Sequence, residues 1–203
     1  DVYKRQRLLQ GDVGSGKTLI AALSALHSHS NNWQTAFLCP TEILAEQHFN
    51  SFQAWFNELG LKTELLTGST KAKERKLIVK ELALGEIDIL IGTHAIFQSG
   101  VEFKRLGLTI IDEQHRFGVH QRFSMLEKGG KQNSSPHQLI MTATPIPRTL
   151  AMTVYGSLET SVIDELPPGR NPVQTSSRPD SLRDRVIKRV EEVLSLIHIS
   201  EPT

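Results

Sequence analysis

The 203-residue sequence has a single cysteine, almost no net charge and no long apolar segment. One cysteine, Cys39, excludes an internal disulfide and fits a reducing compartment. Lys and Arg total 23 against 22 Asp and Glu, so no overall field predicts a polyanionic partner and any nucleic-acid contact has to be local. No apolar run approaches the roughly 20 residues that cross a bilayer, and the start carries no signal-like pattern. These absences predict a cytoplasmic protein with no membrane partner.

The sequence also lacks internal repeats and low-complexity blocks, and what it has instead is an alternation of element types. From residue 7 to about 156, short apolar runs alternate with longer amphipathic stretches, as in a parallel sheet covered on both faces. We therefore expect an α/β domain of three layers with a mostly parallel sheet. The predicted strands are residues 7–10, 35–39, 61–66, 87–91, 108–111 and 139–141, and the predicted helices are 19–26, 42–59 and 71–84.

The strongest motif is GDVGSGKT at residues 11–18, which matches the phosphate-binding pattern G-x-x-x-x-G-K-T. A glycine-rich turn presents closely spaced backbone N–H donors that phosphates need. An apolar strand precedes it and an alanine-rich helix follows, a context that disfavours the alternative of a chance glycine turn. Lys17 would reach the β- and γ-phosphates, and Thr18 would offer its hydroxyl to Mg²⁺. The predicted ATP-binding residues are Gly11, Asp12, Val13, Gly14, Ser15, Gly16, Lys17 and Thr18.

Two carboxylates, Asp112 and Glu113, follow the apolar strand predicted at residues 108–111. Ligands of open parallel sheets bind at the carboxyl ends of strands. Asp112 would hold Mg²⁺, and Glu113 would deprotonate the attacking water. Taken alone, two acids after a strand are as often plain solvated side chains, but the phosphate-binding motif favours the catalytic interpretation. Lys17, Asp112 and Glu113 are therefore the predicted catalytic residues.

Residues 112–115 (DEQH) resemble the DExH box of superfamily-two helicases, and residues 142–144 (TAT) resemble the S/T-A-T element of that class. The resemblance implies that this threonine element couples nucleotide state to the grip on nucleic acid. For His115 alone, an ordinary surface or core histidine would be the better interpretation, and its position in the box reverses this. The residues to which the resemblance gives a coupling role are Gln114, His115, Thr142 and Thr144.

A narrower resemblance is to the RecG-like family of ATP-dependent DNA helicases, carried by residues 8–18, 112–119, 141–150 and 164–170. It covers about residues 7–194 and implies a RecA-like P-loop NTPase domain. The implied activity is ATP hydrolysis coupled to remodelling of branched DNA, forks and Holliday junctions, in repair and recombination. The implied partners are double-stranded or branched DNA, bound without regard to sequence, and the wedge and second RecA-like domains of the same protein. Without those domains we expect the chain alone to be inactive.

Two alternative functions stay open. A transcription-repair coupling translocase of the Mfd type shares the Gly-Asp-Val-Gly block and the block at residues 142–150, but has a second glutamate where Gln114 stands and lacks the run at residues 164–170. A nucleotide-gated DNA-binding module without turnover is the other alternative. Glu113 argues against that module, since a switch that does not hydrolyse needs no base.

The resemblance also places DNA contacts in loops that follow strands, on the side opposite the nucleotide. Hydroxyl groups and backbone N–H groups suit a phosphate backbone that is bound without reading bases. Each loop has a plainer interpretation as a helix cap, with Thr41 and Ser69 as capping candidates. The predicted DNA-binding residues are Pro40, Thr41, Gly68, Ser69, Thr93 and His94.

The chain divides into five segments by pattern. Residues 1–6 and 195–203 fit neither neighbouring pattern and are expected to be non-native or disordered tails. Residues 7–160 form the expected ATP-binding domain. Residues 161–180 contain the proline-rich break PPGRNP and are expected to be an interdomain linker. Residues 181–194 have helical periodicity and would start a second helicase domain.

Overall fold

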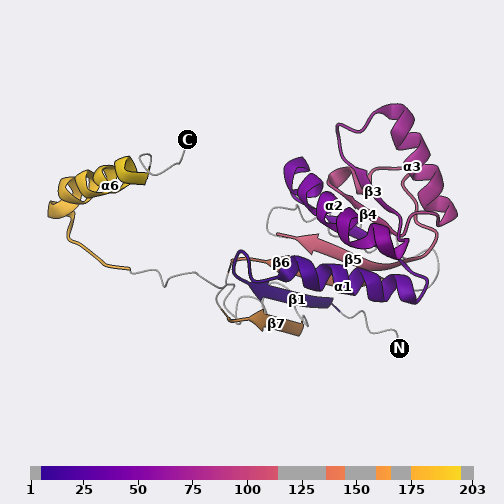
Figure 1. Ribbon diagram of the computed structural model, residues 1–203, viewed down its shortest axis with the longest axis horizontal. Coiled ribbons are helices and arrows are strands. Elements are labelled where there is room, and N and C mark those ends of the chain that lie inside the picture. The colour runs from indigo at the N-terminus through magenta and orange to yellow at the C-terminus, as the bar shows by residue number, and fades with distance from the viewer. Residues whose placement is uncertain (1–5, 114–135, 145–158, 166–174, 198–203) are drawn as a thin grey trace. The chain divides into compact units, whose positions relative to one another are not determined.

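The computed structural model describes residues 6–113, 136–144, 159–165 and 175–197, with side chains up to residue 194. The chain divides into two compact units, Asp1–Pro168 and Gly169–Thr203. The first unit contains a seven-stranded sheet in the order β3-β4-β2-β5-β6-β1-β7 (Figure 1). Its strands are β1 (Gln6–Gly11), β2 (Gln34–Leu38), β3 (Thr63–Leu66), β4 (Ile89–Gly92), β5 (Leu106–Asp112), β6 (His137–Thr142) and β7 (Glu159–Ile163).

Every strand pair in this sheet is parallel, which confirms the expected α/β architecture. In the described part of the first unit, the helices are α1 (Lys17–Ser30), α2 (Glu42–Phe56) and α3 (Ala72–Leu84), with short 3₁₀ turns η1 (Asn57–Leu59) and η2 (His94–Phe97). In a parallel sheet the carboxyl ends of all strands lie at one edge. That edge therefore carries the loops after β1 to β6.

Consecutive strand residues pack on opposite faces, because side chains alternate along a strand. In β2, Phe37 joins the core under α1 and α2, whereas Ala36 and Leu38 join a second core on the other face. Leu90 of β4 likewise packs with α3 and η2 in a third cluster, away from Ile91. Helices thus cover both faces, which is the expected three-layer arrangement.

Helix boundaries follow local chemistry. α2 begins after Thr41, whose hydroxyl accepts the backbone N–H of Leu44 at 3.3 Å, so the capping interpretation of Thr41 is confirmed. The expected cap at Ser69 is wrong, because α3 begins after Lys71 without a side-chain cap and the Ser69 hydroxyl bonds elsewhere. α2 tightens to the 3₁₀ turn η1 before Gly60, which takes the left-handed conformation (φ 72°) that glycine tolerates.

The edge strand β7 has no counterpart among the expected strands. It pairs in parallel with β1, and the Arg7 guanidinium binds the Glu159 carboxylate and, at 2.8 Å, the Ser161 hydroxyl. Residues 161–163, expected to be linker, are therefore part of the sheet. The segment is short and only partly buried, so its apolar pattern is weak.

The second unit has the short 3₁₀ turn η5 (Asp180–Leu182) followed by α6 (Arg183–Ile197). The helix expected at residues 181–194 corresponds to these two elements. Its apolar side chains are half exposed: Val186, Ile187, Val190, Val193 and Leu194.

Candidate nucleotide site

The loop between β1 and α1 has the conformation that its glycines permit. Gly14 and Gly16 have φ of 81° and 90°, in the left-handed region that side chains with a Cβ rarely adopt. Gly11 is constrained by space, since a Cβ there would lie 2.6 Å from the Ser15 hydroxyl oxygen. The loop is closed by the Ser15 N–H, which donates to the Asp12 carbonyl at 3.2 Å. α1 then starts at Lys17, so the positive end of its dipole faces the loop.

Lys17 and Ser15 are the two side chains of this motif whose contacts bear on phosphate binding. The Lys17 ammonium donates to the carbonyl oxygens of Gly11 and Asp12, both at 2.8 Å. The Ser15 hydroxyl oxygen is buried and, within the described residues, lacks a hydrogen-bond partner. An ammonium group, a buried hydroxyl and a helix N-terminus together fit a phosphate group.

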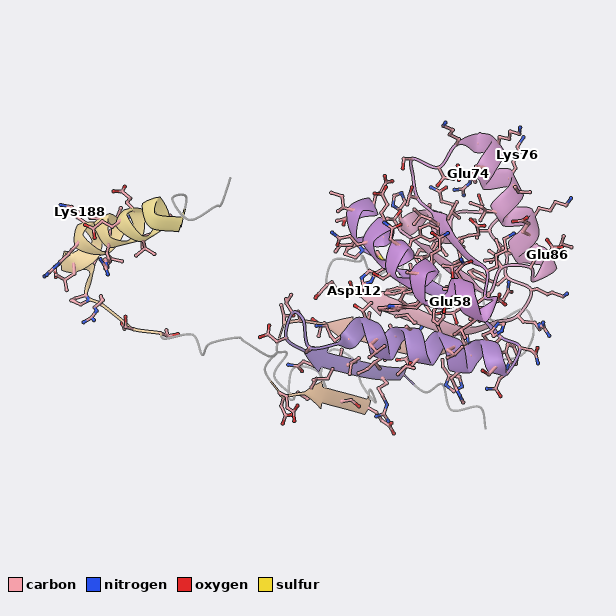
Figure 2. The ribbon with its side chains drawn as sticks, viewed as in Figure 1. Glu58, Glu74, Lys76, Glu86, Asp112 and Lys188 are labelled. Atoms are coloured by element: carbon pink, nitrogen blue, oxygen red, sulfur yellow. The ribbon has the colours of Figure 1, made fainter. Side chains whose placement is uncertain are left out.

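Asp112 ends β5, which lies beside β6 in the sheet and is separated from β1 by β6. Figure 2 labels its side chain. Its side chain is 13% exposed, and its Oδ2 lies 3.2 Å from Nε2 of His48 on α2. Burial, and after it the negative charge of Asp112, raises the pKa of the Cys39 thiol, so the cysteine stays protonated. Carboxylate and hydroxyl oxygens, as on Asp112 and Thr18, are the ligand type that Mg²⁺ prefers.

Glu113 has an unusual backbone, with φ of 50°. Its N–H donates to the Met141 carbonyl at 2.9 Å, which continues the β5–β6 ladder by one bond. Its carboxylate accepts the Ala143 N–H at 2.9 Å and the Thr142 hydroxyl at 3.3 Å. The Thr142 and Thr144 hydroxyl oxygens are 2.9 Å apart. Glu113 and the threonine element therefore form one hydrogen-bonded group.

The sequence did not predict this contact between Glu113 and the threonine element. The resemblance gives the coupling role on the DEQH side to Gln114 and His115 instead. Both of those residues lie outside the described part of the chain. The pairing of neighbouring strands could have predicted this contact of Glu113. β5 and β6 pair with Asp112 beside Met141, so the residues that follow the two strands lie next to each other.

The predicted DNA-binding loops follow β2, β3 and β4, and they come together. The Glu42 carboxylate, at the start of α2, accepts the Ser69 hydroxyl at 2.8 Å and the Ser69 N–H at 3.2 Å. A Cβ on Gly68 would lie 3.1 Å from Glu42 and 4.0 Å from His94. We call Glu42 and Ser69 the Glu42–Ser69 contact. The Thr93 hydroxyl, in the third loop, is buried and has no partner among the described residues.

Pro40 also follows β2, at the same edge of the sheet. The expectation that DNA contacts and the nucleotide lie on opposite sides is therefore imprecise. All these loops share one edge because every strand is parallel. Along this edge, the loops after β3, β4 and β2 occupy one half, and the loops after β5, β6 and β1 occupy the other.

Two further contacts were not predicted from the sequence: that of His48 with Asp112 and that of Glu42 with Ser69. His48 lies between Ala45 and Phe52 on the stripe of α2 that faces the core, so its position resembles that of an ordinary core residue. No pattern in the sequence connects either side chain with its partner on another element.

Among the described residues, no helix is long and apolar enough to span a membrane. A parallel sheet with a phosphate-binding loop after β1 and carboxylates after β5 defines a P-loop nucleotide-binding domain of the RecA-like type. The DEAD/DEAH box helicase family model matches residues 2–153, and the chain belongs to that family.

Within this family, the sequence is similar to the DNA helicase RecG of several bacteria. The chain is 59% identical to the ATP-dependent DNA helicase RecG of Escherichia coli (strain K12) over 184 residues, which are 91% of this chain and 27% of that protein. It is 52% identical to RecG of Aquifex aeolicus (strain VF5) over 188 residues, 93% of this chain and 24% of that protein. The chain thus spans about a quarter of the length of these relatives and is a RecG-like helicase segment.

Solved structures agree. A structure of RecG bound to a three-way DNA junction has a TM-score of 0.74 and 44% identity, covering 93% of this chain and 25% of that one. The Hef helicase domain of Pyrococcus furiosus, with a TM-score of 0.60 and 21% identity, covers 80% of this chain and 36% of that one and shares the fold.

Proposed function

We propose that this chain is the ATP-binding motor domain of a DNA helicase that remodels branched DNA in repair and recombination. The observation that carries the proposal is the shared edge of the sheet. It brings the phosphate-binding loop, the two carboxylates and the threonine element together beside three loops suited to a phosphate backbone. Similarity to RecG, including a RecG solved on a three-way junction, supports branched DNA as the substrate.

Lys17 is the residue that responds first to nucleotide. Its ammonium now binds two loop carbonyls, and those bonds are lost when it turns towards phosphate oxygens. The exchange replaces two neutral carbonyl acceptors by anionic phosphate oxygens, which attract the ammonium more strongly. The Ser15 hydroxyl gains the partner that it lacks. The loop backbone and the start of α1 stabilise the negative charge.

Asp112 and Thr18 would hold Mg²⁺, which supplies charge neutralisation between the phosphates when bound. Glu113 would take the proton from the attacking water. Its carboxylate accepts the Ala143 N–H and the Thr142 hydroxyl. The same two bonds orient the carboxylate and connect the base to the threonine element.

On the other half of the edge, the three loops would contact the DNA backbone. Hydroxyl and backbone N–H donors recognise phosphate without reading bases, which suits a motor that moves along any sequence.

The test is a chimera in which this chain replaces the matching 184-residue segment of the Escherichia coli relative. We expect the chimera to hydrolyse ATP more rapidly with fork DNA than with linear duplex, and a Lys17→Ala chimera to show no stimulation. Loss of fork response in a folded, nucleotide-binding chimera, while the intact relative responds, would contradict the proposed function.

A further inference from the structure

His48 is a buried polar side chain that no sequence motif assigned to the site. It lies in the second turn of α2, and its ring centroid is 4.7 Å from that of Phe37 in β2. Its side chain and that of Asp112 are each 13% exposed, and Nε2 lies 3.2 Å from Oδ2. Two elements far apart in sequence thus meet at one hydrogen bond.

The direction of this bond follows from the chemistry of its acceptor. An ionised carboxylate can only accept, so Nε2 of His48 carries the hydrogen. The bond engages Oδ2, and among the described residues no hydrogen bond to Oδ1 is found. One oxygen is therefore fixed and the other is left for a metal ion or its bound water.

Asp112 needs such a partner. The carboxylate lies beside the fully buried Cys39, and a buried carboxylate without hydrogen bonds is costly. The docking of α2, by contrast, does not need the polar contact, because Ala45, Phe52 and Phe56 already pack it on the sheet. The hydrogen bond from His48 therefore stabilises the Asp112 carboxylate and is not required for the packing of α2.

We propose that His48 is a positioning residue, which fixes the orientation of the Asp112 carboxylate for Mg²⁺ bound with the nucleotide. The inference rests on the proposed function, since it takes Asp112 as the metal carboxylate. Partners that orient metal-binding side chains typically change metal affinity by about 10–100-fold when they are removed. It follows that α2, which starts at the Glu42–Ser69 contact, connects the predicted DNA loops with the metal carboxylate.

Two substitutions separate hydrogen bonding from packing. His48→Phe keeps a ring against Phe37 and removes the donor, whereas His48→Gln keeps an N–H near the Nε2 position and removes the ring. The measurement is ADP binding to the 203-residue chain, once with EDTA and once with excess Mg²⁺. The ratio of the two dissociation constants is taken within each variant, so a partly unfolded variant affects both values alike.

We expect Mg²⁺ to tighten ADP binding by the wild type. The Mg²⁺ effect should fall about tenfold, or vanish, in His48→Phe and be largely retained in His48→Gln, with affinity in EDTA unchanged in both. In Asp112→Asn the effect should be lost, and adding His48→Phe should lower it no further, since the two residues act through one bond.

Several outcomes would overturn the proposal. A wild-type ratio in His48→Phe, or a larger one, would show that the histidine only packs or competes with the metal. Loss of the Mg²⁺ effect in His48→Gln but not in His48→Phe would assign the role to the ring. A wild-type chain that binds ADP but ignores Mg²⁺ would remove the metal role of Asp112, whereas no ADP binding at all would contradict the proposed function itself.

Discussion

Glu113 combines a constrained backbone with an oriented side chain. A φ of 50° costs on the order of 1 kcal/mol or more for a residue with a Cβ. That conformation turns the side chain from the end of β5 towards Thr142 and Ala143 at the end of β6. The two hydrogen bonds to the carboxylate offset the cost of this backbone conformation. This favours a function that depends on the orientation of the Glu113 carboxylate as well as on its charge.

We predict that Glu113→Gln abolishes turnover and preserves nucleotide binding. The glutamine oxygen can still accept the Ala143 N–H, and its amide can donate to the Thr142 hydroxyl, so the group keeps its shape while the base is lost. Fork-stimulated hydrolysis by the chimera should fall by about 10²–10⁴-fold, the usual contribution of a general base. ATP affinity, measured by titration on the same sample, should change little.

The control is Glu113→Ala, which removes the base and both hydrogen bonds to the threonine element. It should lose turnover as well and should also weaken the effect of DNA on ATP affinity. Near-normal hydrolysis by the glutamine variant would assign the base to another residue.

Among the elements, the loop after β3 binds a carboxylate at the position where we predict a DNA phosphate. That carboxylate belongs to Glu42 at the start of α2. The Ser69 hydroxyl and N–H both donate to Glu42, so neither is available to DNA in this conformation. A carboxylate and a phosphate oxygen compete for the same donors. DNA binding at Ser69 therefore requires that the Glu42–Ser69 contact opens.

We accordingly predict that Glu42→Gln strengthens binding to double-stranded DNA by about 3–10-fold at low salt. The change removes a negative charge that would repel the DNA phosphates, and it replaces the Glu42 carboxylate by an amide, which is a weaker acceptor for the Ser69 donors. The matched control is Glu46→Gln, one turn further along α2, which changes the net charge equally but lies on an exposed position. Fluorescence anisotropy with a labelled duplex oligonucleotide measures both variants.

The opposite result has a clear meaning. If Glu42→Gln weakens DNA binding while Glu46→Gln does not, the carboxylate holds the loop in its binding conformation. The competition described here would then be wrong.

At the scale of the whole molecule, the sequence was most informative where patterns are local. The loop at residues 11–18 and the apolar strands were predictable because glycine spacing and buried strands are visible within a few residues. β7 was not, since its pairing with β1 depends on Arg7 and Ser161, 154 positions apart. The contacts of His48 with Asp112 and of Glu42 with Ser69 depend on the strand order, which no short pattern encodes.

The same strand order explains the correction on DNA contacts. Sequence reasoning separated nucleotide and DNA residues by side, but in a fully parallel sheet the loops that follow strands share one edge. The residues predicted for the two functions are then neighbours, with β2 beside β5 at the boundary. Short connections such as the bond from His48 to Asp112 can cross it.

We propose that residues 11–18 bind the phosphates of ATP through Lys17, and calorimetric titration of Mg·ATP into the 203-residue chain measures this binding. We predict saturable binding by the wild type and at least tenfold weaker binding by Lys17→Ala, because a charge-assisted contact to phosphate is worth about 1.5–3 kcal/mol. Lys76→Ala, on the exposed face of α3 (Figure 2), removes the same charge elsewhere and should bind like the wild type. Absence of binding in the folded wild type, or equal affinity in Lys17→Ala, would contradict the account.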